Sequence, residues 1–190
     1  GLTGYSVVLT DPPWLIKTPL EMSGSEAPAA LLREVSALWQ RAARAVVVLG
    51  DCSDQRLIAS VEGRYLRCGV IERVPPSYRG SVLSLGWMFH VFGEGVLSGN
   101  GHRVLSGHGR AASRRDDRFD AEHPASFSIE AAKWLVRYYT RESDCILDPF
   151  AGTGAILAAA KYAGRRAIGI EVERTYCDLA ITRLAQTMFA

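Results

Sequence analysis

Residues 145–154 decide the fold, and they read Cys-Ile-Leu-Asp-Pro-Phe-Ala-Gly-Thr-Gly. Three apolar residues lead into an acidic residue and a proline, which is the pattern of a buried strand that ends in a loop. Helical periodicity follows over residues 155–163. Glycines between a strand and a helix allow backbone N–H groups and a helix N-terminus to come close to a ligand. The stretch therefore predicts a ligand-binding loop in an α/β domain.

Glu171 indicates the kind of ligand. It stands at the end of the next predicted strand, residues 166–170, and 19 positions after Gly152. An acidic side chain in that place accepts hydrogen bonds from both hydroxyls of a ribose. Leu157 occupies the position where a dinucleotide fingerprint needs a small residue, and no lysine or arginine follows the loop before Lys161. We therefore expect a nucleoside cofactor without a pyrophosphate, such as S-adenosylmethionine.

Strands and helices alternate along the rest of the chain. Buried strands are predicted at residues 7–10, 46–49, 65–74 and 81–92, the last as a strand or a strand pair, and helices at 29–45, 129–140 and 174–188. The third strand is expected to stop at Pro75-Pro76, and residues 94–122 to form a long loop. This alternation predicts an α/β fold with a mostly parallel sheet. Because ligands bind at the carboxyl ends of such strands, the acidic residues that follow them are site candidates: Asp11, Asp51, Asp148 and Glu171.

Length and composition favour one globular domain and argue against a disordered or membrane-spanning protein. The 190 residues suit a single domain, residues 1–190, and 48% hydrophobic with 22% charged residues is a globular rather than a disordered composition. No apolar run approaches the roughly 18 residues that span a bilayer, so we expect no membrane partner. The four cysteines contain no C-x-x-C pair, and we expect reduced thiols, no metal site and a cytoplasmic location.

The catalytic candidates follow the first predicted strand as Asp11-Pro12-Pro13-Trp14. An exocyclic amine of a nucleobase is a poor nucleophile because its lone pair is delocalised into the ring, so hydrogen-bond acceptors must hold it. Asp11 supplies a carboxylate and Pro12 a carbonyl, while neither proline has an N–H to compete. The ring of Trp14 offers an apolar face for a base extruded from the duplex. The simpler alternative is a rigid turn, which two prolines also produce.

Four motifs occur in one order along the chain: Asp11-Pro12-Pro13-Trp14, then His123-Pro124 with Phe127, then residues 148–154, then Gly169-Ile170-Glu171 with Tyr176. In this order they resemble the beta group of amino-group DNA methyltransferases, the N6-adenine and N4-cytosine enzymes whose catalytic motif precedes the cofactor motif. The resemblance implies a Rossmann-like, S-adenosylmethionine-dependent methyltransferase fold, with a seven-stranded sheet and a circularly permuted motif order.

The resemblance also implies roles for single residues. The methionine end of the cofactor would lie near Asp148, Phe150, Gly152 and Gly154, its ribose on Glu171, and His123 to Phe127 would close the site from the far side. The sequence departs from the family at Ser128, where a second proline is usual, and at Ala155 and Ile156, which replace threonines. Family members often carry a further acidic motif before the catalytic strand, and residues 1–6 do not show it.

Residues 94–122 are expected to face nucleic acid. The segment contains glycines, which make it pliable, and arginines, which bind phosphates: Arg103, Arg110, Arg114 and Arg115. A solvated surface loop is the alternative, because acidic residues follow at 116, 117, 120 and 122. The segment is short for an independent recognition domain, so we expect a short or degenerate target sequence.

Together these features favour methyl transfer from S-adenosylmethionine to the N6 amine of a flipped adenine in double-stranded DNA, without a metal or a covalent intermediate. Asp11 favours adenine because the N4-cytosine enzymes of the group commonly have serine there. Four alternatives stay open: N4-cytosine methylation, RNA N6-adenine methylation, a non-catalytic nucleic-acid-binding relic, and a nicotinamide-dependent oxidoreductase. The sequence leaves the oligomeric state undecided, with a homodimer as one alternative, and it does not tell whether a restriction nuclease accompanies the protein.

Overall fold

The computed structural model describes residues 5–12, 27–41, 43–50, 58–79, 82–93, 108–112, 119 and 127–186. These residues form a seven-stranded sheet in the order β5-β3-β4-β2-β1-β6-β7. Its strands are β1 (Val7–Thr10), β2 (Ala45–Gly50), β3 (Tyr65–Arg79), β4 (Val82–Gly93), β5 (His108–Ala112), β6 (Cys145–Asp148) and β7 (Arg166–Gly169). Only β4 runs against its neighbours, which makes the sheet mixed but mostly parallel, as the sequence predicts.

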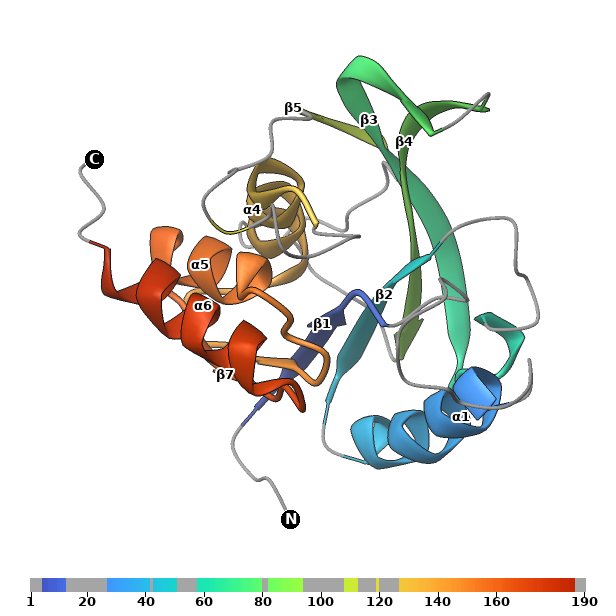
Figure 1. Cartoon of the computed structure of the whole chain (residues 1–190). Helices are drawn as coiled ribbons and strands as arrows, with labels where there is room; N and C mark the ends of the chain where they lie inside the picture. The colour runs from blue at the N-terminus through green and yellow to red at the C-terminus, as the bar shows by residue number, and fades with distance from the viewer. Residues whose placement is uncertain are drawn as a thin grey trace.

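Helices cover both faces of the sheet (Figure 1). On one face lies α1 (Ala27–Gln40), whose Leu32 and Trp39 pack on the apolar side chains of β1 and β2. On the other face lie α4 (Ile129–Tyr139) and α5 (Ala155–Tyr162), with α6 (Arg174–Ala185) beside α5. Within the described residues, no helix combines the length and the apolarity needed to cross a membrane.

The central strands are short and wholly buried. Every residue of β1 and of β6 is buried, and in β2 only Gly50 is not. Strands that are covered on both faces read as continuous apolar runs, which is why residues 7–10, 46–49 and 145–147 were recognisable from the sequence. Since β1, β6 and β7 are neighbours and run in parallel, the residues that follow them emerge at the same edge of the sheet.

The prediction that the third strand stops at Pro75 is wrong. β3 continues through both prolines to Arg79, and its pairing with β4 shifts register between Glu72 and Ser77. A proline cannot donate to a backbone ladder, so it fits a strand only where the ladder is interrupted, and here the interruption spans both prolines. Residues 82–93 form the single strand β4 rather than a strand pair.

The prediction of a continuous loop over residues 94–122 is also wrong, because β5 lies within it. β5 pairs in parallel with β3 from Val70 to Val74. Its Gly109 lies so close to α4 that an added Cβ would stand 2.3 Å from Cε2 of Trp134. The sequence of β5 has no β-branched residue and no Phe, Tyr or Trp, so its neighbours rather than its own propensity hold it in the sheet.

The helix predictions hold with shifted ends. α1 begins two residues earlier and ends five residues earlier than residues 29–45, and α6 ends at Ala185 rather than at residue 188. α4, α5 and the strand β7 lie within one residue of their predicted bounds.

Candidate cofactor and catalytic site

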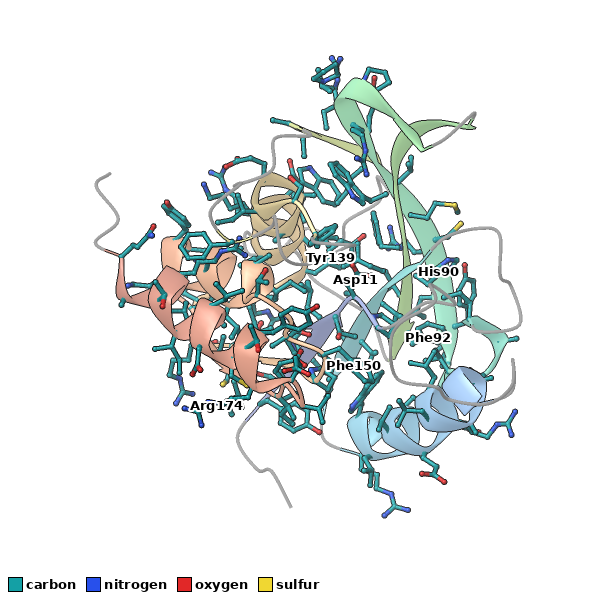
Figure 2. All side chains as sticks on the ribbon, in the orientation of Figure 1. Asp11, His90, Phe92, Tyr139, Phe150 and Arg174 are labelled. Atoms are coloured by element: carbon teal, nitrogen blue, oxygen red, sulfur yellow. The ribbon has the colours of Figure 1, made fainter. Side chains whose placement is uncertain are left out.

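Three acidic residues meet at the carboxyl edge of the sheet. Asp11 follows β1, Asp148 ends β6, and Glu171 follows β7. Asp11 and Glu171 both act electrostatically on the carboxyl group of Asp148. In Figure 2, Asp11 and Phe150 both lie in the middle of the molecule, between α1 and the α5–α6 pair, whereas Arg174 points outward from α6. The structure therefore brings the catalytic candidate and the glycine loop to one side of the sheet.

Asp148 lies deepest in the group, with 1% of its surface exposed. Its Oδ1 accepts hydrogen bonds from Oγ1 of Thr10 at 2.8 Å and from the backbone N–H of Phe150 at 3.3 Å. Burial is the main influence on its pKa and raises it to about 7; the two hydrogen bonds lower the pKa, and the charges of Asp11 and Glu171 raise it. Near pH 7, then, the protonated and ionised forms of this buried carboxyl group are both populated, and a bound cation would favour the ionised form.

Glu171 is tied to the glycine loop. Its Oε2 accepts a hydrogen bond of 2.7 Å from the N–H of Gly152, and its Oε1 accepts one of 2.9 Å from the N–H of Glu173. Each carboxylate oxygen has two lone pairs, so each keeps one for a further donor. This arrangement ties the carboxylate to the loop and leaves it acceptor capacity for further donors, while its contact with a ribose stays a prediction.

Two glycines give the loop its shape. Gly152 and Gly154 have φ values of 51° and 78°, which favour glycine, and Gly154 caps the N-terminus of α5. A Cβ on Gly154 would stand 2.9 Å from Cβ of Ala180, so its absence lets α6 pack closely against the loop.

Leu157, which stands where a dinucleotide fingerprint needs a small residue, packs closely against the strand β7. Its side chain lies over Gly169 of β7, where an added Cβ would stand 2.6 Å from Cδ1 of Leu157. The space that a small residue would have left on the helix is provided by a glycine on the strand. The helix α5 and the strand β7 therefore pack closely with the large residue, Leu157, on the helix and the glycine, Gly169, on the strand.

The aromatic candidates divide between the two faces. Phe150 contacts Trp39 of α1 edge to face, with ring centroids 6.4 Å apart. Phe127 precedes α4 in the chain and is buried. It contacts Trp87 of β4 edge to face, with ring centroids 5.9 Å apart. Beside it, the hydroxyl of Ser128 donates to the carbonyl of Ala112 at 2.9 Å and so joins β5 to α4. A proline at position 128 would lack this bond.

Several predicted site residues lie outside the described residues: Pro13, Trp14, Asp51, Arg103, Arg114, Arg115, His123 and Pro124. Of the four arginines, the structure describes Arg110. It lies on β5, its side chain is 66% exposed, and its Nε stands 3.1 Å from Oε2 of Glu72. In the parts of the chain that are described, no group of three or more histidine, cysteine or acidic side chains is arranged to hold a metal ion.

Two residues at the site were not predicted from the sequence. Thr10 is fully buried and bonds to Asp148, and the signal for it was a polar residue that ends an apolar run. Arg183 of α6 is buried; it donates to Oγ1 of Thr153 at 3.2 Å, and its guanidinium group lies 4.6 Å from the ring centre of Phe119. Nothing in the sequence near Arg183 indicated that its side chain would reach the glycine loop.

Comparison with known proteins gives the family. A family model described as a DNA methylase, N6_N4_Mtase, matches residues 79–182, which is more than half of the chain. The chain belongs to this family of DNA methylases. The matched residues contain the glycine loop and Glu171, whereas Asp11 lies outside them.

Curated relatives match shorter stretches. The orphan methyltransferase M.BamHII of Bacillus amyloliquefaciens is 33% identical over 82 residues, which are 43% of this chain and 30% of that protein. The type II methyltransferase M.MthZI of Methanothermobacter thermautotrophicus is 39% identical over 64 residues, 34% of this chain and 18% of its own length. The matched stretches thus span less than a third of either relative.

Solved structures of the same fold cover almost the whole chain. A complex of M1.HpyAVI with SAM superposes with a TM-score of 0.71 at 18% identity, over 97% of this chain and 90% of the other. The cytosine-N4-specific PvuII DNA methyltransferase superposes with a TM-score of 0.72 at 16% identity, over 98% of this chain and 82% of the other. The fold of this chain is therefore one that solved DNA methyltransferases also have, which agrees with the family given by the sequence.

Proposed function

We propose that this methylase transfers the methyl group of S-adenosylmethionine to an exocyclic amine of a DNA base, with N6 of adenine as the favoured acceptor. The observation that carries the proposal is the hydrogen bond from Thr10 to Asp148. Thr10 directly precedes Asp11, which lies outside the residues matched by the family model, and Asp148 begins the glycine loop inside them. The bond therefore links the residue next to Asp11, the candidate hydrogen-bond acceptor for the amine, with the glycine loop, the candidate cofactor site.

The residues at this edge fit the cofactor by chemistry. The carboxylate of Glu171 is held at the loop by two N–H donors and retains acceptor capacity for two ribose hydroxyls. Asp148 offers a buried carboxyl group for the cationic amino group of the methionine end, and a bound cation would lower its raised pKa. S-adenosylmethionine supplies an electrophilic methyl group on a sulfonium centre.

Asp11 and Pro12 would hold the amine. The carboxylate of Asp11 accepts one N–H and the carbonyl of Pro12 the other, which keeps the lone pair of the nitrogen directed at the methyl group. Trp14 would stack on the flipped base. In this direct displacement the N–C bond would form as the sulfonium C–S bond breaks, the thioether product would leave, and the proton lost by the amine would pass to the carboxylate of Asp11 or to water. The contribution of the protein is to orient the amine and to provide fixed acceptors. The proposed displacement needs no covalent bond between a side chain and the base.

Double-stranded DNA is the proposed partner. Arg103, Arg114 and Arg115 would contact phosphates, with a smaller part for Arg110 because Glu72 already lies beside it. Adenine is favoured over cytosine by the identity of Asp11 alone, and the fold is compatible with either base.

A single experiment tests catalysis, polymer and base together. The chain is incubated with tritiated S-adenosylmethionine and a mixture of DNA and RNA, and the digested nucleosides are analysed by mass spectrometry. We expect N6-methyldeoxyadenosine. N4-methyldeoxycytidine would change the base, N6-methyladenosine in RNA would change the polymer, and cofactor binding without label in any nucleic acid would favour the non-catalytic relic.

A further inference from the structure

Thr10 links the two parts of the proposed site. It is the last residue of β1, it is fully buried, and its Oγ1 donates to Oδ1 of Asp148 at 2.8 Å. A buried hydroxyl costs free energy unless it is hydrogen-bonded. Here its acceptor belongs to the strand that enters the glycine loop, while the next residue in the chain is Asp11.

The backbone ladder does not make this connection. The register between β1 and β6 ends with the pair Val8 and Leu147. Asp148 and Thr10 are each still paired on the opposite side of their strand, Asp148 with β7 and Thr10 with β2. Beyond the pair Val8 and Leu147, the Thr10–Asp148 side-chain bond therefore joins the ends of β1 and β6 where their loops begin.

We propose that Thr10 is a positioning residue, whose hydroxyl orients the carboxylate of Asp148 and fixes the place of Asp11 relative to the glycine loop. The part that concerns Asp11 rests on the proposed methyl transfer, whereas the part that concerns Asp148 does not. Valine has nearly the volume of threonine but lacks the hydroxyl, so exchanging the two at this buried position removes the bond to Asp148 with little change in side-chain volume. The exchange therefore tests the contribution of the hydroxyl.

Removal of the hydroxyl has a definite electrostatic consequence. The groups that act on Asp148 are the Thr10 hydroxyl and the N–H of Phe150, which favour the charged carboxylate, and the charges of Asp11 and Glu171, which oppose it. Without the hydroxyl, the pKa of Asp148 rises above its value of about 7. At neutral pH the carboxyl group would then be mostly protonated and would hold a cationic ligand less well.

The test compares Thr10→Val with Thr10→Ser, which keeps the hydroxyl. The matched control is Thr140→Val, which removes another fully buried hydroxyl, one that donates to the carbonyl of Val136 at the end of α4. The dissociation constant of S-adenosylmethionine is measured by calorimetry from pH 6 to pH 9. For Thr10→Val we expect the midpoint of the pH dependence to move up by about one unit and the affinity at pH 7 to fall about fivefold. Thr10→Ser and Thr140→Val should follow the wild-type profile.

A Thr10→Val profile that superposes on the wild-type profile would overturn the inference. If Thr10→Val does not fold, Thr10→Cys takes its place, because a thiol is a weak donor and should give an intermediate shift. If the chain binds no cofactor, urea unfolding of the free protein from pH 5 to pH 9 makes the same comparison, since a higher pKa of Asp148 moves the pH dependence of stability upward.

Methyl transfer separates this inference from the proposed function. At saturating cofactor, Thr10→Val should lower kcat about tenfold through the misplaced Asp11, and Thr10→Ser should restore it. A wild-type chain that binds the cofactor but methylates neither DNA nor RNA would refute the proposed function, while the binding profiles would still decide the role of Thr10.

Discussion

The two ends of the sheet differ in how their strands relate to chemistry. At one end, β6 and β7 are four residues long each, and both are followed at once by acidic or glycine-rich segments. At the other end, β3 and β4 are 15 and 12 residues long and pair mainly with each other. In the first region the candidate functional residues follow short strands, whereas in the second two long strands pair with each other.

Charge follows the same division. The β1–β6–β7 edge brings together Asp11, Asp148 and Glu171. The β3–β4–β5 end carries arginines in contact with aromatic or acidic partners: the guanidinium group of Arg73 lies 4.1 Å from the ring centre of Trp87, and Arg110 pairs with Glu72. The difference suggests that substitutions at the first edge change cofactor binding and catalysis, and that substitutions at the second change stability or nucleic-acid affinity.

Asp11→Ala should have the largest effect. Loss of an acceptor aimed at the reacting amine is expected to lower methyl transfer at least about 10³-fold. The affinity for S-adenosylmethionine should stay within a factor of about two, because Asp11 is not expected to touch the cofactor and its charge only opposes that of Asp148. Label transfer and calorimetry on the same preparation give both numbers. A loss of cofactor binding of the same size as the loss of transfer would show that Asp11 belongs to the cofactor site instead.

Asp148 gives the next largest effect, through the pH dependence of stability. Its folded pKa of about 7 lies above its ordinary value of 3.8, so between these values the folded state holds a proton that the unfolded state has lost. The contribution of Asp148 to the free energy of unfolding is therefore full below pH 4, falls as the pH rises and is lost above pH 7. From pH 5 to pH 7 the fall is at most about 3 kcal/mol.

Asp148→Asn removes this titration and keeps an acceptor oxygen for Thr10 and Phe150. Urea unfolding at pH 5, 6, 7 and 8 should show a stability difference between variant and wild type that shifts in favour of the variant as the pH rises, then levels off above pH 7. A difference that is constant across the four values would mean that Asp148 is already ionised at pH 5, and the electrostatic account of the edge would be wrong.

The same comparison explains which features were predictable from the sequence. Asp11 and Glu171 were found because each follows an apolar run, so a local pattern places them at the carboxyl edge. Thr10 was missed because its partner lies 138 positions away along the chain. The space for Leu157 was missed for a related reason: Gly169 provides it from another element. Local patterns identify which residues end a strand, but contacts between distant elements depend on the assembled fold.

The wrong predictions for β3 and β5, at the other end of the sheet, have a similar cause. Pro75 and Pro76 are strong signals for the end of a strand, and β3 passes through them because its ladder with β4 is interrupted there. β5 contains no strong strand former, and it is held by β3 and by the close approach of Gly109 to Trp134. In both places tertiary packing outweighs local propensity.

Gly154→Ala should have a moderate effect, and Gly164→Ala is its matched control. Both glycines have positive φ, at 78° and 67°, so an alanine is strained at either position by about 1 kcal/mol. At Gly164 no atom lies within 4 Å of the added Cβ, whereas at Gly154 it meets Cβ of Ala180 at 2.9 Å. We expect Gly154→Ala to lose about 1–2 kcal/mol more than the control in urea unfolding. It should also bind S-adenosylmethionine more weakly, which Gly164→Ala should not. Equal losses in the two variants would show that α6 moves away from the loop easily.

Arg110→Ala should have the smallest effect and tests the nucleic-acid part of the comparison. The ion pair with Glu72 is exposed on both sides, and exposed pairs contribute about 0–1 kcal/mol, so the stability should change little. For DNA binding, each phosphate contact adds about 0.9 to the slope of log affinity against log salt concentration. Because Glu72 competes with DNA for Arg110, Arg110→Ala should reduce the slope by less than one full contact. The joint replacement of Arg114 and Arg115 should reduce the slope more, and it should weaken binding to all DNA sequences alike. The measurement is fluorescence anisotropy on one duplex at four salt concentrations. An Arg110→Ala slope reduced by a full contact, with the double variant unchanged, would place the DNA on the β5 edge of the sheet rather than on residues 113–118.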